Sequence, residues 1–333
     1  MGPEKQNGNG GTNGKNGNGD SPYAISFVIP TGSMEAAVLE LLEAADWRVT
    51  KQNGSRGYEN IIQDPRFREV TSQRPQEIPL QVFSGRFDLG LTGQDWVAEQ
   101  GLKGELAEVC TLPLTKSGVG FAKIVLAVLA DSDIKTVEDL RVEEGAEKYR
   151  VSTEYPHITE AYFKKKGIDV EIDFSHGATE VKPCKGLCDA IVELTETGTS
   201  LAQNNLKVID ELMRTTACLV ATRESLSEHR ETIKEIVMLL SGTVSARGKA
   251  LLKFHFPESK KERLLELLPR DRLPTFSPLM GRGLNDDLLA VEIVVPTRTD
   301  RSQGILGANM LIPRLKKAGA VDVIEIPLSK QIP

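Results

Sequence analysis

Cysteine and histidine are scarce in this chain of 333 residues, which contains four of each. The cysteines are irregularly spaced, which argues against a disulfide framework. Cys184 and Cys188 lie close together, but no second pair or nearby histidine completes a zinc set. We therefore expect all four to be buried or free thiols; they are Cys110, Cys184, Cys188 and Cys218.

Long apolar runs are also missing. No run reaches the roughly 18 residues that cross a membrane, and residues 1–21, rich in Gly and Asn, lack the apolar core of a signal peptide. Their composition is typical of a disordered tail or a cloning remnant. The sequence predicts no membrane segment and a cytoplasmic location.

Positive charge is in deficit. The formal net charge of −6 argues against general nucleic-acid binding, which requires a basic surface. The remaining composition, 40% hydrophobic and 26% charged, is that of an ordinary globular protein. The length predicts two or three domains with ample core.

Strand and helix patterns alternate from residue 23 to about residue 221. This alternation predicts an α/β fold with a mostly parallel sheet in two lobes, and a ligand cleft between the lobes as in solute-binding proteins. Two short strands, 208–209 and 217–221, are expected to return to the first lobe. The other expected strands are 24–29, 87–91, 124–129, 149–153, 170–174 and 190–194, and the expected helices are 34–45, 78–84, 92–99, 137–140 and 158–166.

The pattern changes after one long expected helix, 228–250. The elements that follow have the order βαββαβ of a ferredoxin-like module, which is often a regulatory or assembly unit. They are expected at 251–256, 259–268, 275–279, 288–295, 310–318 and 321–326. The predicted domains are a tail at 1–21, a first lobe at 22–118 and 205–230, a second lobe at 119–204, a connecting helix at 231–250 and a regulatory domain at 251–333.

The most informative segment is Asp189–Leu201, in which two carboxylates precede a Thr-Gly-Thr-Ser turn and a helix. Hydroxyls and backbone N–H groups at such a turn form a cradle for a phosphate monoester. Upstream acids would repel a bare phosphate, but they suit a ligand that also offers ribose hydroxyls or a divalent cation. The segment is therefore either a phosphoribosyl site or a plain helix cap.

Several other loops carry candidate ligands. The turn Pro30–Ser33 either offers N–H groups to an anion or simply connects a strand to a helix. Arg56 suits a phosphate contact, because a guanidinium matches phosphate oxygens, but it is equally a solvated loop residue. Arg74 either binds a ligand or pairs with Glu77.

A further group of polar residues flanks the expected loops. Glu180 and Lys182 are candidates for polar substrate groups, whereas Asp95 and Glu99 are interpreted as a helix cap and a solvated residue. The histidines near these loops, His157 and His176, have no paired nucleophile, so no hydrolase triad emerges. Phosphoribosyl transfer needs no protein nucleophile, because the acceptor attacks ribose C1 directly while the protein orients and neutralises.

From about residue 23 onward the chain resembles the ATP phosphoribosyltransferase family in its long form, with a C-terminal regulatory domain. The order of the matching motifs over the whole length makes the resemblance specific. The motifs are RPQEIP (74–79), DLGLTGQDW (88–96), GATEVKP (177–183), Asp189–Leu201, NNL (204–206), PTFSPL (274–279) and LKKAGA (315–320).

The resemblance implies the first step of histidine biosynthesis. Adenine N1 of ATP attacks phosphoribosyl pyrophosphate, giving phosphoribosyl-ATP and pyrophosphate, with Mg²⁺ as cofactor. It also implies a homo-hexamer that histidine inhibits by binding the C-terminal, ACT-like domain.

Site residues follow from the same resemblance. Glu180, Asp189 and Glu193 are the expected catalytic residues, the last two near the ribose or the metal. The 5′-phosphate is expected on Glu196, Thr197, Gly198, Thr199, Ser200 and Leu201. ATP and its phosphates are expected on Gly32, Ser33, Arg56, Arg74, Gly177, Ala178 and Thr179.

The chain departs from the family pattern at two places. Thr31 stands where the family usually has a lysine, and Ala202-Gln203 stands where an arginine commonly follows the leucine. Both changes remove positive charge from a phosphate site, unless Arg56 or Lys182 replaces it. They motivate an alternative function, a catalytically weak or inactive two-lobed sensor of nucleotides or amino acids.

Overall fold

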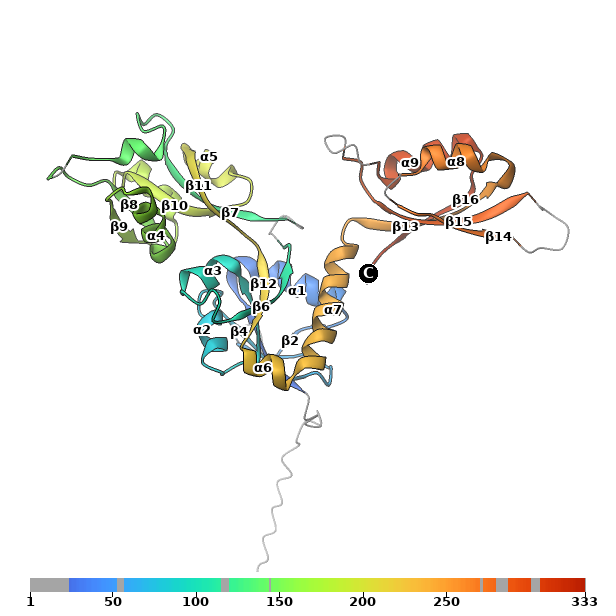
Figure 1. The fold of residues 1–333 in the computed structure, drawn as a ribbon, viewed down its shortest axis with the longest axis horizontal. Helices are drawn as coiled ribbons and strands as arrows, with labels where there is room; N and C mark the ends of the chain where they lie inside the picture. The colour runs from blue at the N-terminus through green and yellow to red at the C-terminus, as the bar shows by residue number, and fades with distance from the viewer. Residues whose placement is uncertain are drawn as a thin grey trace, which may run out of the picture.

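The part of the chain that the structure describes forms three β-sheets, each with its own helices (Figure 1). The computed structural model describes residues 24–52, 57–114, 120–143, 145–269, 272–279, 287–300 and 306–332. The predicted tail and the Arg56 contact lie outside these residues. Every helix in the described part of the chain is too short or too polar to cross a bilayer.

The first sheet is built around β1 (Ile25–Pro30), whose side chains are buried on both faces. Ile25 and Phe27 pack with α1 and α7 on one face, whereas Val28 packs with α2 on the other, which explains the continuous apolar run. The strand order is β2-β3-β4-β1-β5-β12-β6. The other members are β2 (Thr50–Lys51), β3 (Glu59–Ile61), β4 (Phe67–Gln73), β5 (Leu89–Gly93), β6 (Ala107–Leu112) and β12 (Ala217–Ala221), with helices η1 (Gly32–Met34), α1 (Glu35–Ala44), α2 (Ile78–Phe83), α3 (Gln94–Glu99), α6 (Arg223–Glu228) and α7 (Arg230–Ala246).

The second sheet has the order β11-β7-β10-β8-β9. Alternate residues of β7 enter separate cores: Ile124 and Leu126 pack toward Phe163 of α4, while Val125 packs toward Leu201 of α5. The elements are β7 (Ala122–Leu129), β8 (Arg150–Thr153), β9 (Glu171–Phe174), β10 (Ala190–Thr195) and β11 (Leu206–Thr215), with η3 (Val137–Leu140), α4 (Pro156–Lys166), η4 (Thr179–Val181), η5 (Pro183–Lys185) and α5 (Thr199–Gln203).

Two predictions about these sheets are wrong. Both sheets are mixed rather than mostly parallel, because β12 runs antiparallel to β5 and β7 runs antiparallel to β10. The strand expected at 208–209 is the ten-residue β11, which pairs with β7, so residues 206–215 belong to the second sheet and not to the first lobe. Only β12 returns to the first sheet.

The chain leaves the first sheet after β6 and enters the second at β7, and it returns at Thr216, between β11 and β12. The Thr216 hydroxyl donates to the carbonyl of Leu112 at 3.1 Å and accepts the N–H of Leu114 at 3.1 Å. One buried side chain therefore joins both crossings. This geometry is that of a hinge between two lobes.

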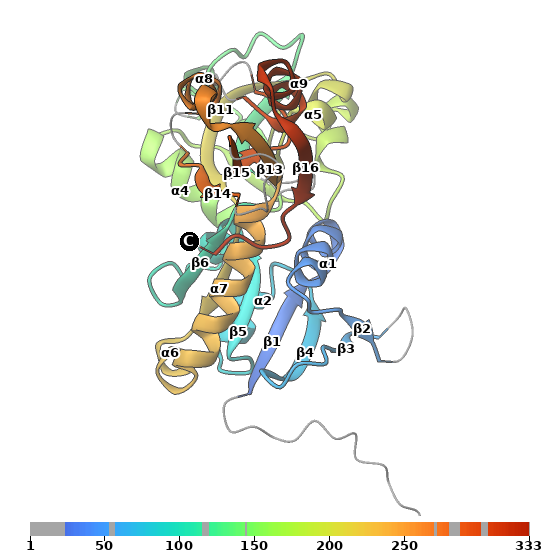
Figure 2. The same ribbon diagram turned by 90° about the vertical axis from the view of Figure 1, so that its right-hand side faces the viewer.

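The C-terminal sheet confirms the predicted ferredoxin-like module, with all strand pairs antiparallel in the order β14-β15-β13-β16. Figure 2 shows α7 leading from the first sheet toward it. The long helix expected at 228–250 is confirmed as α7 but is shorter, because it begins at Arg230 after the separate helix α6 and Gly248, at φ 68°, ends it before β13. The elements are β13 (Lys249–Pro257), η6 (Glu258–Lys260), α8 (Lys261–Leu267), β14 (Thr275–Pro278), β15 (Leu288–Pro296), α9 (Ala308–Ala318) and β16 (Val321–Pro327).

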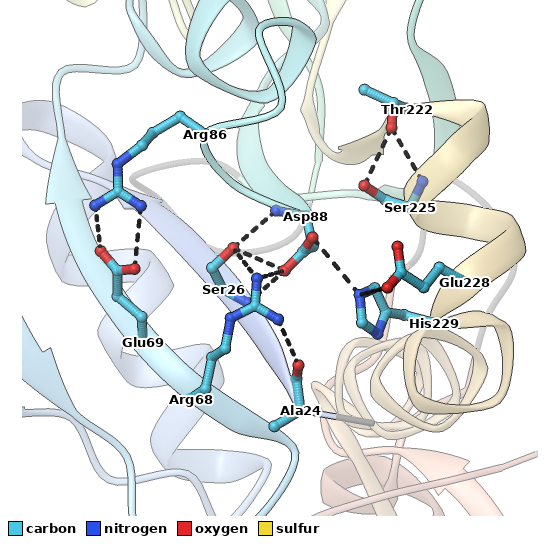
Figure 3. Close-up of polar contacts among 10 residues, drawn as sticks. All are labelled: Ala24, Ser26, Arg68, Glu69, Arg86, Asp88, Thr222, Ser225, Glu228 and His229. Carbon is cyan, nitrogen blue, oxygen red and sulfur yellow. Dashed lines mark hydrogen bonds and ion pairs between the residues drawn. The ribbon is translucent and has the colours of Figure 1, made fainter. Parts of the chain in front are cut away.

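A polar cluster fixes the start of α7 against the first sheet (Figure 3). Asp88 Oδ2 accepts hydrogen bonds from the N–H and the hydroxyl of Ser26, each at 2.7 Å, and from Arg68 at 2.8 Å. The other oxygen of Asp88 lies 3.7 Å from Nε2 of the buried His229, the residue before α7. This carboxylate therefore links β1, β4 and α7 at the end of the sheet away from the hinge.

Candidate functional site

A cleft of about 510 Å³ lies between the first and second lobes, a volume that suits small-molecule ligands. It collects the carboxyl ends of β1, β4 and β5 from the first lobe and of β8 and β10 from the second, where α/β proteins bind ligands. The chemistry-bearing residues that line it are Thr31, Gly32, Ser33, Arg74, Gln76, Asp95, Glu154, Tyr155, Glu193, Glu196, Thr215 and Thr216.

The loop from β10 to α5 holds the predicted phosphate cradle. Gly198 adopts φ 75°, a conformation that favours glycine, and its N–H donates to the hydroxyl of Thr195 at 2.9 Å. The hydroxyls of Thr197 and Thr199 lie 2.8 Å apart and are exposed. Glu196 lines the cleft. The loop thus presents hydroxyls at the cleft edge, whereas the Leu201 side chain is buried in the core and leaves only its backbone for the expected ligand contact.

The predicted segment 177–180 lies beside this loop. Ser200 Oγ donates to Glu180 Oε1 at 3.2 Å, which connects the two segments. Gly177 has φ 110°, and a Cβ there would lie 3.7 Å from a carboxylate oxygen of Glu154. Ala178 also has a positive φ of 51°. Thr179 is buried and donates to the hydroxyl of Ser175 at 2.9 Å, so it stabilises the turn.

Three carboxylates gather on the second-lobe side of the cleft. Burial raises the pKa of Glu193 to about 7, and the negative charges of Glu154 and Glu180 contribute. Burial also raises the pKa of Glu154, where repulsion from Glu180 is opposed by attraction to Arg74. The pKa of Glu193 therefore lies near neutral pH.

The expectation that Asp189 lies near the ribose or the metal is not met. Asp189 precedes β10, at the strand end opposite the loop that begins with Glu196. Its carboxylate accepts the N–H of Arg150 at 2.7 Å, and its own N–H donates to the Arg150 carbonyl at 2.9 Å. The residue closes the β8–β10 pairing. Motif proximity in sequence misled here, because a six-residue strand separates the two ends by about 20 Å.

The first-lobe side of the cleft contains the turn after β1 and the loop after β4. Gly32, at φ 73°, and Ser33 line the cleft at the start of η1. Arg74 also lines it. The alternative pairing of Arg74 with Glu77 is absent from the ion pairs of the described residues; instead the Glu77 N–H donates to the Arg74 carbonyl at 3.0 Å. Thr31 donates its hydroxyl to the carbonyl of Gln73 at 3.2 Å.

Lys182 does not replace the missing lysine. Its ammonium donates to Ser152 Oγ at 2.7 Å and lies 3.3 Å from Asp173, on the second lobe outside the cleft lining. Arg74 is consequently the one cation among the described residues that line the cleft.

Sequence reasoning missed the buried pair at the base of the cleft. The Tyr155 hydroxyl donates to Asp95 Oδ2 at 3.0 Å, and Thr215 donates to Asp95 Oδ1 at 2.7 Å. The Asp95 carboxyl also accepts backbone N–H groups in the first turn of α3, as the predicted helix cap requires, and burial raises its pKa. Glu99 is also buried rather than solvated. The positions of Glu154 and Tyr155 directly after β8 were the available signal, since loops at strand carboxyl ends form such sites.

The donor chemistry of the cleft fits a cation that arrives with the substrates. Four carboxylates and one guanidinium line it, so phosphate oxygens would be repelled without a counter-charge. In the described ranges no three His, Cys, Asp or Glu side chains are placed to hold a metal by themselves. The residues thus suit Mg²⁺ that keeps phosphate and water ligands, as this ion prefers.

Comparisons with known proteins agree with this architecture. The family model of ATP phosphoribosyltransferase matches residues 74–242, and the model described as "HisG, C-terminal domain" matches residues 246–330. ATP phosphoribosyltransferases from Pelotomaculum thermopropionicum and Thermodesulfovibrio yellowstonii are each 38% identical; the alignments cover 93% of this chain and 99% and 98% of those proteins.

A solved structure shows the same fold. The chain from an ATP phosphoribosyl transferase (HisG:HisZ) complex of Thermotoga maritima superposes with a TM-score of 0.54 at 24% identity, over 66% of this chain and 98% of that one. Two family models and full-length relatives lead to one conclusion: the chain belongs to the ATP phosphoribosyltransferase family, in the long form that carries the C-terminal domain.

Proposed function

We propose that this chain joins ATP and phosphoribosyl pyrophosphate in the interlobe cleft, as the first step of histidine biosynthesis. The observation that carries the proposal is the cleft itself, which collects motif residues of both lobes in about 510 Å³. Full-length relatives named ATP phosphoribosyltransferase support the same reaction.

Different cleft residues are proposed to bind the two substrates. In the proposed arrangement the loop Glu196–Ser200 holds the 5′-phosphate with hydroxyls and backbone N–H groups. Arg74 and the turn Gly32–Ser33 hold the phosphates of the nucleotide. The two substrates are thereby fixed with adenine N1 facing ribose C1, which converts a bimolecular encounter into an oriented one.

In the transfer step adenine N1 forms a bond to ribose C1 while the bond from C1 to the pyrophosphate oxygen breaks. Positive charge develops on the ribose, and the carboxylates of Glu154 and Glu193 lie in the cleft to stabilise it. When bound with the donor, Mg²⁺ would neutralise the departing pyrophosphate. Glu180, bonded to Ser200, positions the phosphate loop in this account.

Regulation and assembly are part of the proposal. We propose that histidine inhibits the enzyme through the C-terminal module and that the chain forms a homo-hexamer, as the family resemblance implies. Because both substrates are phosphorylated metabolites, we place the reaction in the cytoplasm.

Pyrophosphate release tests the function. We expect Mg²⁺-dependent release only when ATP and phosphoribosyl pyrophosphate are both present. The alternative, a non-catalytic sensor, has no support in the comparisons and predicts ligand binding by calorimetry without turnover. Binding without release in histidine-free buffer would establish the sensor, and Thr31→Lys would then be expected to restore some release.

A further inference from the structure

Helix α3 of the first lobe packs into the cores of both lobes. It follows β5 of the first sheet directly, and Val97 packs in the first-lobe core. Trp96, the residue before, packs in the second-lobe core and stacks on Tyr155 at a ring distance of 4.6 Å. Figure 1 shows α3 at the edge of the first lobe that faces the second. The helix therefore connects the two lobes by packing, beside the hinge.

The amino end of α4 in the second lobe lacks a cap of its own. Its N-cap residue, Tyr155, makes no side-chain cap bond, and Pro156 at the first position has no N–H. The next two N–H groups, of His157 and Ile158, would be left without partners inside the helix. A local Ser, Thr, Asp or Asn would ordinarily satisfy one of them.

Glu99, at the end of α3, supplies this cap from the other lobe. Its two carboxylate oxygens accept the N–H of His157 and of Ile158, each at 3.0 Å. Its backbone carbonyl lies 2.8 Å from His157 Nδ1. The Glu99 side chain is only 5% exposed, and an anion at a helix amino end also meets the positive end of the helix dipole.

The capped end of α4 carries cleft residues. Glu154 and Tyr155 directly precede Pro156, and both line the cleft. The same face of α3 presents Asp95, four residues before Glu99, to the Tyr155 hydroxyl. Two carboxylates of one first-lobe helix thus fix the second-lobe segment that faces the substrates.

We propose that Glu99 is a positioning residue, which caps α4 across the lobe boundary and so sets the place of Glu154 and Tyr155 in the cleft. This inference rests on the proposed function, because turnover is one of its readouts. It predicts that the geometry of the cap, and not only its contribution to folding, determines catalytic efficiency.

A graded series at Glu99 tests this. Glu99→Gln keeps the length and one acceptor oxygen, Glu99→Asp is shorter by about 1.5 Å, and Glu99→Ala removes the cap. The matched control is Asp139→Ala, because Asp139 accepts the N–H groups of Lys135 and Thr136 at 2.8 and 2.9 Å within the second lobe, outside the cleft lining.

We expect kcat/KM to fall about 10- to 100-fold in Glu99→Ala and Glu99→Asp, as ångström-scale misplacement does, and less in Glu99→Gln. Asp139→Ala should stay within about twofold at a temperature where all variants are folded by circular dichroism. Equal kcat/KM across the Glu99 series, with an active wild type, would overturn the inference and leave the proposed function intact.

Hydrogen exchange supplies a readout that does not need turnover. The amides of His157 and Ile158 should exchange faster in Glu99→Ala than in wild type. Their exchange rates in Asp139→Ala should equal those of wild type. A wild type without pyrophosphate release would count against the proposed function. Unchanged exchange at these two amides would overturn the cap itself.

Discussion

At the scale of single residues, the cleft is unusual for its excess of acid. Glu154, Glu193 and Glu196 face the space where anionic substrates are proposed to bind, with Arg74 as the cation among the described lining residues. Burial and mutual repulsion raise the pKa values of Glu154 and Glu193. Buried carboxylates with raised pKa values destabilise the unliganded protein, and such perturbed groups cluster at functional sites.

Glu193 makes the protein less stable as pH rises. With its pKa raised to about 7, the folded state binds more protons than the unfolded state between about pH 4.5 and 7, so unfolding free energy falls across that window. Glu193→Gln should raise the unfolding free energy by about 1–3 kcal/mol at pH 8 and hardly change it at pH 4. Urea unfolding at both pH values measures this; an equal change at both would contradict it.

Asp88 should matter for stability and not for catalysis. Asp88→Ala leaves Arg68 and Ser26 without their shared acceptor, and we expect a loss of about 2–4 kcal/mol. The exposed pair Arg86–Glu69 is the control, since solvent screens this pair and Arg86→Ala should leave the free energy of unfolding nearly unchanged. Both pairs are drawn in Figure 3. A changed KM in folded Asp88→Ala would show that the cluster acts on the cleft.

At the scale of elements, the sequence predicted those strands and helices that are buried on one face or on both faces. The run at β7 and the end of α4 at Gly167 were predictable because an apolar run and a left-handed glycine are local signals. Strand β4 was missed, because Arg68 and Glu69 interrupt its apolar pattern. Strand β11 was underestimated because its polar residues face solvent at a sheet edge.

The same distinction holds for the site. The positions of Gly32, Ser33 and Glu196 along the cleft were predictable from small and hydroxyl residues beside strands. The partnership of Asp95 with Tyr155 joins residues 60 positions apart in different lobes, and no local pattern encodes it. Asp189 was misplaced for the converse reason, since proximity in sequence is not proximity in space along a strand.

Substitutions in the β10–α5 loop should weaken substrate binding more than they lower the free energy of unfolding. Gly198→Ala places a Cβ in open space at φ 75°, at a cost of about 1–2 kcal/mol. We expect the KM for phosphoribosyl pyrophosphate to rise at least about tenfold while the KM for ATP changes little. Gly186→Ala, at φ 67° and also in open space, is the control outside the cleft. Equal effects of the two variants on KM would mean that the loop is only a helix cap.

At the scale of the whole molecule, α7 joins the first lobe to the C-terminal sheet, and the chain end returns along it. The Gln331 N–H donates to the Gly242 carbonyl at 2.8 Å, and Lys330 pairs with Asp46 of the first lobe. The C-terminal module therefore contacts the first lobe at both of its ends, which provides a route for an effector to act on the cleft.

Deleting residues 247–333 should abolish inhibition by histidine. The deletion removes the C-terminal sheet from β13 onward and leaves the hinge and the cleft lining in place. Dose–response curves of pyrophosphate release against histidine measure the effect, with the full chain as control. Inhibition that survives the deletion would place the effector in the catalytic cleft.

We infer that the interlobe cleft forms phosphoribosyl-ATP and that Arg74 is the cation that binds substrate phosphate there. Product formation from ATP and phosphoribosyl pyrophosphate, followed by mass spectrometry, tests it in wild type, Arg74→Ala and Lys182→Ala. We predict product in wild type, at least about a hundredfold less kcat/KM in Arg74→Ala, and a change within a few fold in Lys182→Ala. No product in wild type would exclude this reaction, and equal activity in wild type and Arg74→Ala would exclude the role of Arg74.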